Sequence, residues 1–405
     1  MKKVVLSLAM LAIGFTASAQ SHKNNLTQDG ERNNTTVTQT GTLLNKAVTN
    51  QEGNENTTTL AQTGNLHRSD VQQAGDENKV SIAQYGNGQA VEVIQDGLDN
   101  RTVVDQRETF NTSVNTQDGE YNSIYATQDG VLNSSTINQE GERNEIISEQ
   151  TGFLNFSAME QNGANNSITF TQGELGNDST INQNGNENSV DFVQAGEFNI
   201  SAIGQAGNGN AYTGIQDGAS NTNVVSQGGS GNTANLAVTG RFNTTNFAQD
   251  GDDNTAEMTI TGNDNIVGID QFGDNSSSII SIEGNDNRAY SYQIDNSKST
   301  IDQVGDANVA HVVQLDMNQI SDLYQDGTYN RAEVTQKGAY NNNYVSQNGD
   351  GNEAYTMQDG RFNHSVIMQE GTTNNAVLNQ TGNFHQNVVT QSGAGNMATI
   401  TQGLN

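Results

Sequence analysis

The stretch Tyr121–Asn155 reads YNSIYATQDGVLNSSTINQEGERNEIISEQTGFLN and contains the pattern Gln-x-Gly-x-x-Asn three times. The copies begin at Gln128, Gln139 and Gln150, so the pattern returns every 11 residues. An active site needs its motif only once, and an α-helix is weakened by a Gly in every repeat. The fixed spacing therefore predicts a repetitive structure rather than a single site.

The same unit runs along almost the whole chain. Its first position falls at Gln28 and Gln39 and then every 11 residues from Gln51, with one extra residue before Gln51 and one missing before Gln303. This gives 35 units up to Gln402, and 32 of them begin with Gln. No change in composition marks a second domain, so we predict one repeat region over residues 28–405. The units that do not begin with Gln carry Val238, Ile260 and Ile282.

The residues between Asn and the next Gln have the pattern of a short strand. In NSIYATQ (122–128), Asn122, Ile124, Ala126 and Gln128 point to one side of an extended chain, because side chains alternate with period two. Small or aliphatic residues fill the middle of this set, while Ser, Thr, Tyr and charged residues occupy the other side. Each unit is therefore predicted to be a strand with one buried face, followed by a turn at x-Gly-x-x.

A second period shows how many strands form one coil. The first inward position reads Ser113, Ile124, Ser135, Ile146, so small and large residues alternate over 22 residues. The three missing glutamines are also 22 residues apart. We therefore predict an all-β fold: a β-solenoid of about 17 two-strand coils, each with two 11-residue units, in amyloid-like cross-β stacking. Ser facing Ile fills the narrow interior between the two sheets.

Stacked coils place Gln over Gln and Asn over Asn at about 4.8 Å, where side-chain amides can form hydrogen-bonded ladders. A lone buried amide is costly, but a ladder pairs each donor with the next acceptor. Glycine supplies the turn conformation. The predicted ladder residues are Gln28, Gln117, Asn122, Gln128, Asn133, Gln139, Asn144, Gln150, Asn155, Gln183, Asn188, Gln194, Gln325, Asn330, Gln336, Gln358, Asn363, Gln369, Asn374, Gln391 and Asn396, and the predicted turn glycines are Gly30, Gly119, Gly130, Gly141, Gly152, Gly185, Gly327, Gly360 and Gly371.

Composition excludes several classes of protein. Only 32% of the 405 residues are hydrophobic, which is too few for one large globular core. The formal charge of −30 excludes an electrostatic nucleic-acid binder. The same values are typical of disordered chains, but the chain has no Pro and is periodic throughout. It has no Cys either, so no disulfide stabilises the fold.

The first residues, MKKVVLSLAMLAIGFTASAQ, have the features of an export signal. Lys2 and Lys3 form the positive end, an apolar run follows, and Ala17-Ser18-Ala19 is a small-residue cleavage site. We expect residues 1–19 to be a signal peptide and residues 20–27 a short leader. The apolar run is too short to span a bilayer comfortably, and no other segment is apolar enough, so we do not expect a membrane-spanning protein.

The unit Asn-x5-Gln-x-Gly-x-x-Asn-x5-Gln, as in Asn122–Gln139, resembles the curlin repeat of curli-type bacterial functional amyloids, and the resemblance covers Gln28–Asn405. It implies a secreted subunit that passes through an outer-membrane pore with the help of assembly factors. The subunit would then add to a cell-attached extracellular fibre of its own kind, in the biofilm matrix and in surface adhesion. The Gln and Asn ladders would form the fibre core.

Two other functions stay open from the residues alone: a monomeric β-solenoid rod that acts as a cell-surface adhesin or binds a ligand, and a disordered matrix polymer. A monomeric rod needs capped ends. The repeat continues to Gln402-Gly403-Leu404-Asn405, so we expect no cap, which favours the fibre.

Catalytic and metal-binding patterns are absent from the sequence. No two of the five His residues have a metal-ligand spacing, and a periodic chain offers no unique constellation. Acidic turn residues such as Asp29, Asp96, Asp118 and Asp129 could form a weak cation-binding edge, but like-charge repulsion that delays assembly is the favoured interpretation. We predict no enzyme, cofactor or metal.

Overall fold

The computed structural model describes residues 22–403, and the predicted signal peptide, residues 1–19, lies outside them. The chain divides into two compact units, Met1–Phe198 and Asn199–Asn405, which we describe separately. Residues 22–403 contain strands and turns and no helix. Each of the 35 strands corresponds to one sequence unit.

The first unit contains β1–β16. Their bounds are β1 Lys23–Asp29, β2 Asn34–Thr40, β3 Lys46–Glu52, β4 Thr57–Asn65, β5 Arg68–Asp76, β6 Lys79–Asn87, β7 Ala90–Leu98, β8 Arg101–Thr109, β9 Thr112–Glu120, β10 Ser123–Val131, β11 Ser134–Glu142, β12 Glu145–Phe153, β13 Phe156–Ala164, β14 Ser167–Gln172, β15 Asp178–Asn186 and β16 Ser189–Gln194.

The second unit contains β17–β35. Their bounds are β17 Ile200–Asn208, β18 Ala211–Ala219, β19 Thr222–Ser230, β20 Thr233–Arg241, β21 Thr244–Asp252, β22 Thr255–Asn263, β23 Ile266–Phe272, β24 Ser277–Glu283, β25 Arg288–Ile294, β26 Lys298–Val304, β27 Val309–Gln314, β28 Ile320–Thr328, β29 Arg331–Ala339, β30 Asn342–Asp350, β31 Glu353–Arg361, β32 His364–Thr372, β33 Asn375–Asn383, β34 Gln386–Ala394 and β35 Met397–Gln402.

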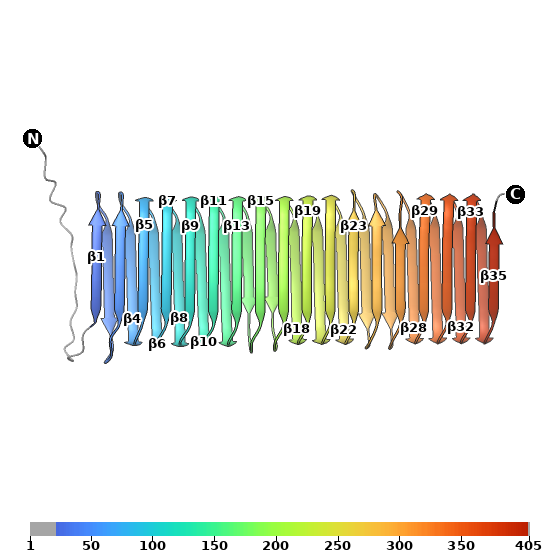
Figure 1. Cartoon of the computed structure of the whole chain (residues 1–405), viewed down its shortest axis with the longest axis horizontal. Helices are drawn as coiled ribbons and strands as arrows, with labels where there is room; N and C mark the ends of the chain where they lie inside the picture. Colours follow the sequence, from blue (N-terminus) through green and yellow to red (C-terminus); the bar gives the residue numbers. More distant parts are fainter. Residues whose placement is uncertain (1–21, 404–405) are drawn as a thin grey trace, which may run out of the picture. The chain divides into compact units, whose positions relative to one another are not determined.

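Strand pairing confirms the predicted two-strand coil. Within each unit, odd-numbered strands pair in parallel with odd-numbered strands and even-numbered with even-numbered, as when Ile124 lies beside Ile146 and Gln128 beside Gln150. Residues 22 apart are therefore neighbours, and Figure 1 shows the odd and even strands of each unit pointing in opposite directions. Two strands per coil make about 17 coils over the described residues, so the predicted all-β solenoid is confirmed.

Turns absorb the two breaks in the sequence period. The extra residue lies between β2 and β3, so Gln28 pairs with Gln51 at a spacing of 23. The missing residue lies between β25 and β26, so Ile282 pairs with Gln303 at a spacing of 21. Strand register survives both changes because turn length can vary without moving the inward face. β1 begins at Lys23, inside the segment 20–27 assigned to a leader from the sequence, because residues before Gln28 form the strand of the first unit.

The core is a narrow layer between the two sheets. Ile124, Ile146 and Ile168 on even strands and Ser113, Ser135 and Ser157 on odd strands are all buried, as their alternation predicts. Burying each Ile contributes about 1.5–3 kcal/mol. Because each strand has only three or four inward positions, the core also depends on the buried amides at the strand ends.

Candidate functional site: amide columns and their turns

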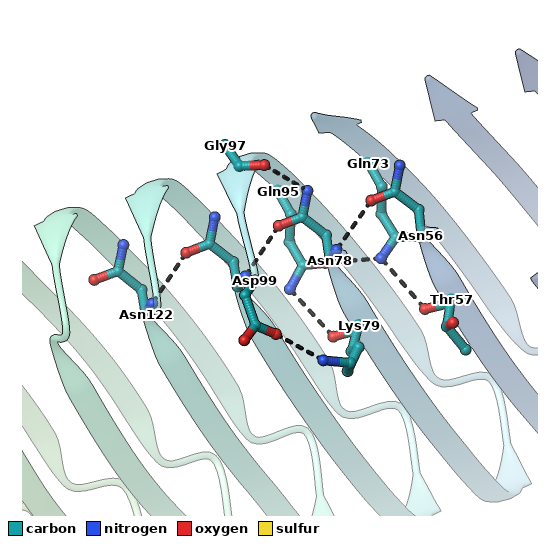
Figure 2. A network of polar contacts seen from close by, with 10 residues as sticks. Asn56, Thr57, Gln73, Asn78, Lys79, Gln95, Gly97, Asp99 and Asn122 are labelled. Carbon is teal, nitrogen blue, oxygen red and sulfur yellow. Dashed lines mark hydrogen bonds and ion pairs between the residues drawn. The ribbon is translucent and has the colours of Figure 1, made fainter. Parts of the chain in front are cut away.

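The inward Gln of each strand bonds to the Gln of the next coil. Gln73 Nε2 donates to Gln95 Oε1 at 2.9 Å, and Gln128 Nε2 donates to Gln150 Oε1 at 2.8 Å. The second hydrogen of Nε2 reaches a backbone carbonyl of the other sheet, as from Gln73 to the oxygen of Thr57 and from Gln95 to that of Lys79 (Figure 2). Each Gln side chain therefore forms one hydrogen bond to the next strand of its own sheet and one to the backbone of the other sheet.

The predicted Gln residues lie in these columns, and the hydrogen bonds from Gln to Gln run in one direction. Nε2 of the earlier coil always donates to Oε1 of the later one, which gives the column a polarity. Such bonds start at Gln28, Gln117, Gln128, Gln139, Gln150, Gln325, Gln336, Gln358 and Gln369. Gln183 and Gln194 are fully buried, Gln391 is buried, and Gln28 in the first coil is half-buried.

The predicted Asn residues act mainly as turn clamps. Asn78 accepts the backbone N–H of Asn100 at 3.0 Å, and its Nδ2 donates to the turn carbonyl of Ala74 at 2.8 Å. The same Nδ2 donates to the carbonyl of Gly97 in the next coil at 3.0 Å (Figure 2). One side chain therefore closes its own turn and holds the next coil. A simple Asn-to-Asn amide ladder, as the sequence suggested, is only part of this arrangement: direct Nδ2-to-Oδ1 bonds occur at some coils, such as Asn166 to Asn144 at 3.1 Å.

The other predicted Asn residues follow the same scheme. Their Nδ2 atoms donate to the turn carbonyl 19 residues ahead at Asn122, Asn133, Asn144, Asn155, Asn330, Asn363 and Asn374. Asn188 and Asn396 donate their backbone N–H to the Asn 22 residues before them. All of these side chains are buried except that of Asn396, which lies beside the last described strand and is exposed.

The turn glycines are required by close approach as well as by φ. The predicted glycines all have φ between +93° and +135°. A Cβ added to Gly119 would lie far inside van der Waals contact with the carbonyl oxygen of Gly141, the same oxygen that accepts from Asn122. Glycine therefore lets successive turns stack closely enough for the Asn clamp to reach.

Sequence reasoning missed a second positive-φ residue in each turn. The residue before Asn adopts φ near +57° in most coils, for example Leu132 at 59° and Glu187 at 58°. Residue type gives little warning, because Leu, Phe, Tyr, Glu, Arg and Asp all occur there. The available signal was the glycine found at the same place in a few units, as at Gly88, Gly209 and Gly351.

Val238, Ile260 and Ile282 form an aliphatic interruption in the even-strand column. They pair with one another on β20, β22 and β24, and each is about 1% exposed. At some coils of the amide columns a hydroxyl lies seven residues after Gln and accepts from its Nε2, as Thr102 does from Gln95. The residues seven places after Ile260 and Ile282 are the buried Val267 and Ala289, whereas the residue seven places after Val238 is the buried Thr245, so the hydroxyl is replaced at two of the three positions.

The end of this interruption leaves one acceptor without a donor. Gln303 pairs with Ile282 on one side, and its Oε1 is buried with no hydrogen-bond partner. Its Nε2 still donates to Gln325 Oε1 at 2.7 Å. Within the described residues, the aliphatic stretch therefore meets the amide column at two places, where Gln216 pairs with Val238 and where Ile282 pairs with Gln303.

His67 stands at an Asn position and is buried. Its backbone N–H donates to Asn45 Oδ1 at 3.0 Å, its Nε2 lies 3.2 Å from the Thr63 carbonyl oxygen, and its Nδ1 has no partner. Burial lowers the pKa of His67 below its ordinary value, with carbonyl contacts opposing the shift. The ring therefore serves as a neutral replacement for the Asn clamp.

Many acidic turn residues also have a structural role. Asp76 Oδ1 accepts the backbone N–H and the side chain of Asn54 in the preceding coil, at 2.8 Å and 2.9 Å. Asp252 and Asp274 accept backbone N–H groups in the same way. Within residues 22–403, no group of three or more His, Asp or Glu side chains is placed to hold a metal ion.

Comparison with known proteins gives one family. Residues 75–107 match the model of the curlin associated repeat, and this match supports the curlin-repeat family for the chain. That family is a family of structural proteins. No curated protein matches the chain significantly. A search of the described residues for helices long and apolar enough to cross a membrane finds none.

Proposed function

From the curlin associated repeat that this chain carries, we propose that the protein is a secreted structural subunit that self-assembles into extracellular, curli-like amyloid fibres of a biofilm matrix and serves in surface adhesion. It performs no catalysis. An outer-membrane pore and assembly factors are its proposed partners in export, and the predicted signal peptide starts that route.

The observation that carries this proposal is that, within each unit, most coils are joined to the next by the same contacts. Toward the preceding coil, a coil presents Gln Oε1 as an acceptor and the Asn backbone N–H as a donor, and toward the following coil it presents Gln Nε2 as a donor and Asn Oδ1 as an acceptor. A second molecule that continues the register therefore meets the same bonds that hold the chain itself together. Among the described residues, β1 and β35 each pair with a single strand, so their other edges present unpaired backbone groups.

Charge supports controlled rather than immediate assembly. The formal charge of −30 makes separate molecules repel, while seeded addition gains a full set of ladder bonds at once. Growth on an existing end is therefore favoured over spontaneous nucleation.

The test is to dilute the mature chain, residues 20–405, from denaturant with and without sonicated fragments of its own fibres. We expect circular dichroism to show strands, electron microscopy to show unbranched fibres, and the fragments to remove the lag phase. The matched control uses fragments of an unrelated amyloid, which should leave the lag phase unchanged. Discrete rods that stay monomeric at high concentration would contradict the proposal and support a monomeric adhesin, and a chain without strands would support a disordered polymer.

A further inference from the structure

Large apolar side chains gather along one edge of the first unit. This edge consists of the turns that follow the even-numbered strands β2–β16, and we name it the apolar edge. Its aliphatic and aromatic side chains are 39–54% exposed, although the sequence as a whole is poor in such residues. They are Leu43, Leu44, Leu66, Phe110, Leu132, Phe153, Leu154 and Phe198.

The opposite edge of the same unit has a different character. It consists of the turns that follow the odd-numbered strands β1–β15, and we name it the acidic edge. Here the positive-φ position carries charged or polar residues and one Tyr, and carboxylates such as Glu52 and Asp76 flank it. The positive-φ residues are Arg32, Glu55, Glu77, Asp99, Tyr121, Arg143, Asn165 and Glu187.

Backbone conformation makes the apolar edge costly to maintain. Leu66, Phe110, Leu132, Leu154 and Phe198 have φ between +56° and +60°, a region that suits Gly and Asn better than bulky residues. Their exposed side chains gain little from burial in the folded unit to offset this cost. A strained residue with an exposed apolar side chain points to a role outside the fold itself.

At two turns of the apolar edge the positive-φ residue is glycine, and an aromatic ring from the next coil covers the position that lacks a side chain. The ring of Phe110 lies over Gly88 of the preceding coil, and the ring of Phe198 lies over Gly176. A Cβ at either glycine would collide with the ring. Each ring therefore covers two coils and closes a gap in the apolar surface.

We propose that the apolar edge is a lateral contact site for a second copy of this chain, so that fibres associate side by side through the first unit. The inference rests on the proposed function, because it concerns how the fibres it describes pack together. Two observations identify the partner. The apolar side chains recur with the coil spacing of about 4.8 Å, and a second copy has the same spacing by construction.

Charge also favours a second copy at this edge. With a net charge of −30, two chains repel wherever their carboxylates face each other, as they would at the acidic edge. On the apolar edge carboxylates are few, namely Glu108, Asp129, Glu174 and Glu197. The same net charge opposes an anionic lipid surface as the partner. Contact between two apolar edges thus removes hydrophobic surface from water with the least like-charge repulsion.

The test replaces apolar residues at positive φ with Asn, a residue that adopts this backbone conformation more readily. A variant with Leu66→Asn, Phe110→Asn, Leu132→Asn, Leu154→Asn and Phe198→Asn places Asn at positive φ, where it is well tolerated, so the fold should be retained or strengthened. The matched control carries Arg32→Asn, Glu55→Asn, Tyr121→Asn, Arg143→Asn and Glu187→Asn at the same turn position on the acidic edge, and it leaves the net charge unchanged. A double variant, Leu132→Asn with Leu154→Asn, guards against failure of the fivefold variant to assemble.

Seeded fibres of each variant would be scored by cryo-electron microscopy for the fraction in side-by-side contact, with circular dichroism as the check on folding. We expect lateral contact in the wild-type fibres and in the control, and a fall of about tenfold or more in the fivefold variant, equivalent to roughly 1.4 kcal/mol. The double variant should lie between them. Added salt should increase lateral contact of the wild type by screening charge.

Three outcomes would overturn the inference. The first is equal lateral contact in the wild type and both apolar-edge variants. The second is a control that separates as much as the fivefold variant. The third is wild-type fibres that remain single but bind phosphatidylcholine vesicles through the apolar edge, which would identify a lipid partner. All three leave fibre formation intact, whereas a wild-type chain that forms no fibres would remove the proposed function and this inference together.

Discussion

The same inward position of the even-numbered strands is an amide on β6, β8, β10, β12 and β14 and an aliphatic side chain on β20, β22 and β24, and the two stretches stabilise stacking in different ways. On β6, Gln84 takes part in four hydrogen bonds: it accepts from Gln62 and Ser69 and donates to Gln106 and to the Arg68 carbonyl. On β22, Ile260 relies on packing against Val238 and Ile282. The amide column fixes register and direction but needs every partner, whereas the aliphatic column tolerates any neighbour of suitable size.

The largest loss of stability is expected from removing an amide whose hydrogen-bond partner has no other donor nearby. Gln84→Leu leaves Gln106 Oε1 buried without its donor, and the nearby inward residue of the facing strand is Val91, which has no hydroxyl. We expect the substitution to lower stability by about 1–3 kcal/mol. It would be measured as a lower guanidinium midpoint for dissolving fibres, followed by circular dichroism.

Gln62→Leu is the matched control for this change. It removes the donor to Gln84 Oε1, but the hydroxyl of Ser69 still donates to that oxygen at 2.9 Å. The midpoint should therefore fall less than in Gln84→Leu. Equal losses in the two variants would show that orphaned acceptors do not control the amide column.

The reverse substitution tests the aliphatic stretch. Ile260→Gln buries an amide between two aliphatic side chains and should cost about 1–3 kcal/mol in the same assay. Combining it with Val238→Gln and Ile282→Gln rebuilds a continuous column, so the three changes together should cost less than the sum of the single losses. Simple additivity would argue against cooperative ladders.

A smaller effect is expected in the Asn column at His67. Because burial lowers the pKa of His67 in the folded chain, the unfolded chain binds its proton first as pH falls below about 6.5. The free energy of unfolding should therefore be highest above that pH. It should decrease as the pH drops from there toward the lower folded-state pKa of His67. His67→Asn restores the repeat residue and should remove this part of the pH dependence. If the variant loses stability over the same pH range as the wild type, this prediction is wrong.

The smallest effect is expected where the aliphatic stretch ends and the amide column resumes, at Gln303. Gln303 Oε1 already lacks a donor, and Gln303→Leu moves the orphaned acceptor to Gln325 without adding a second one. Its cost should stay within about 0.5 kcal/mol, in contrast to Gln84→Leu. A loss as large as that of Gln84→Leu would mean that the amides contribute one by one, independent of their neighbours.

Much of the fold could be predicted because the sequence repeats each physical requirement many times. The alternation of Ser113, Ile124 and Ser135 specified the 22-residue coil, since only strands of one sheet share an inward size. Strand faces, the Gln columns and the turn glycines followed from the same period. The family resemblance then gave the proposed assembly, which pairing within one chain does not test.

The rest depended on contacts between coils that a single unit does not reveal. The Asn clamp needs the carbonyl of a turn 19 residues ahead, as from Asn122 to Gly141, and no local pattern marks that pair. The positive φ before Asn was hidden because residues as different as Leu132 and Glu187 adopt it. The apolar edge and the acidic edge differ because the turns after even-numbered strands lie on one side of the solenoid and those after odd-numbered strands on the other, which a single unit does not reveal.

The central claim is that neighbours along a fibre are residues 22 apart in one chain, and pyrene excimer emission tests it directly. The chain has no cysteine, so Tyr125→Cys with Ile147→Cys would place two labels on paired outward positions of β10 and β12. In fibres diluted with excess unlabelled protein, this variant should give excimer emission, while Tyr125→Cys with Thr136→Cys, on opposite sheets, should not. Excimer emission that disappears on dilution, and that Tyr125→Cys alone gives in undiluted fibres, would contradict the account, because identical residues of different molecules would then be stacked.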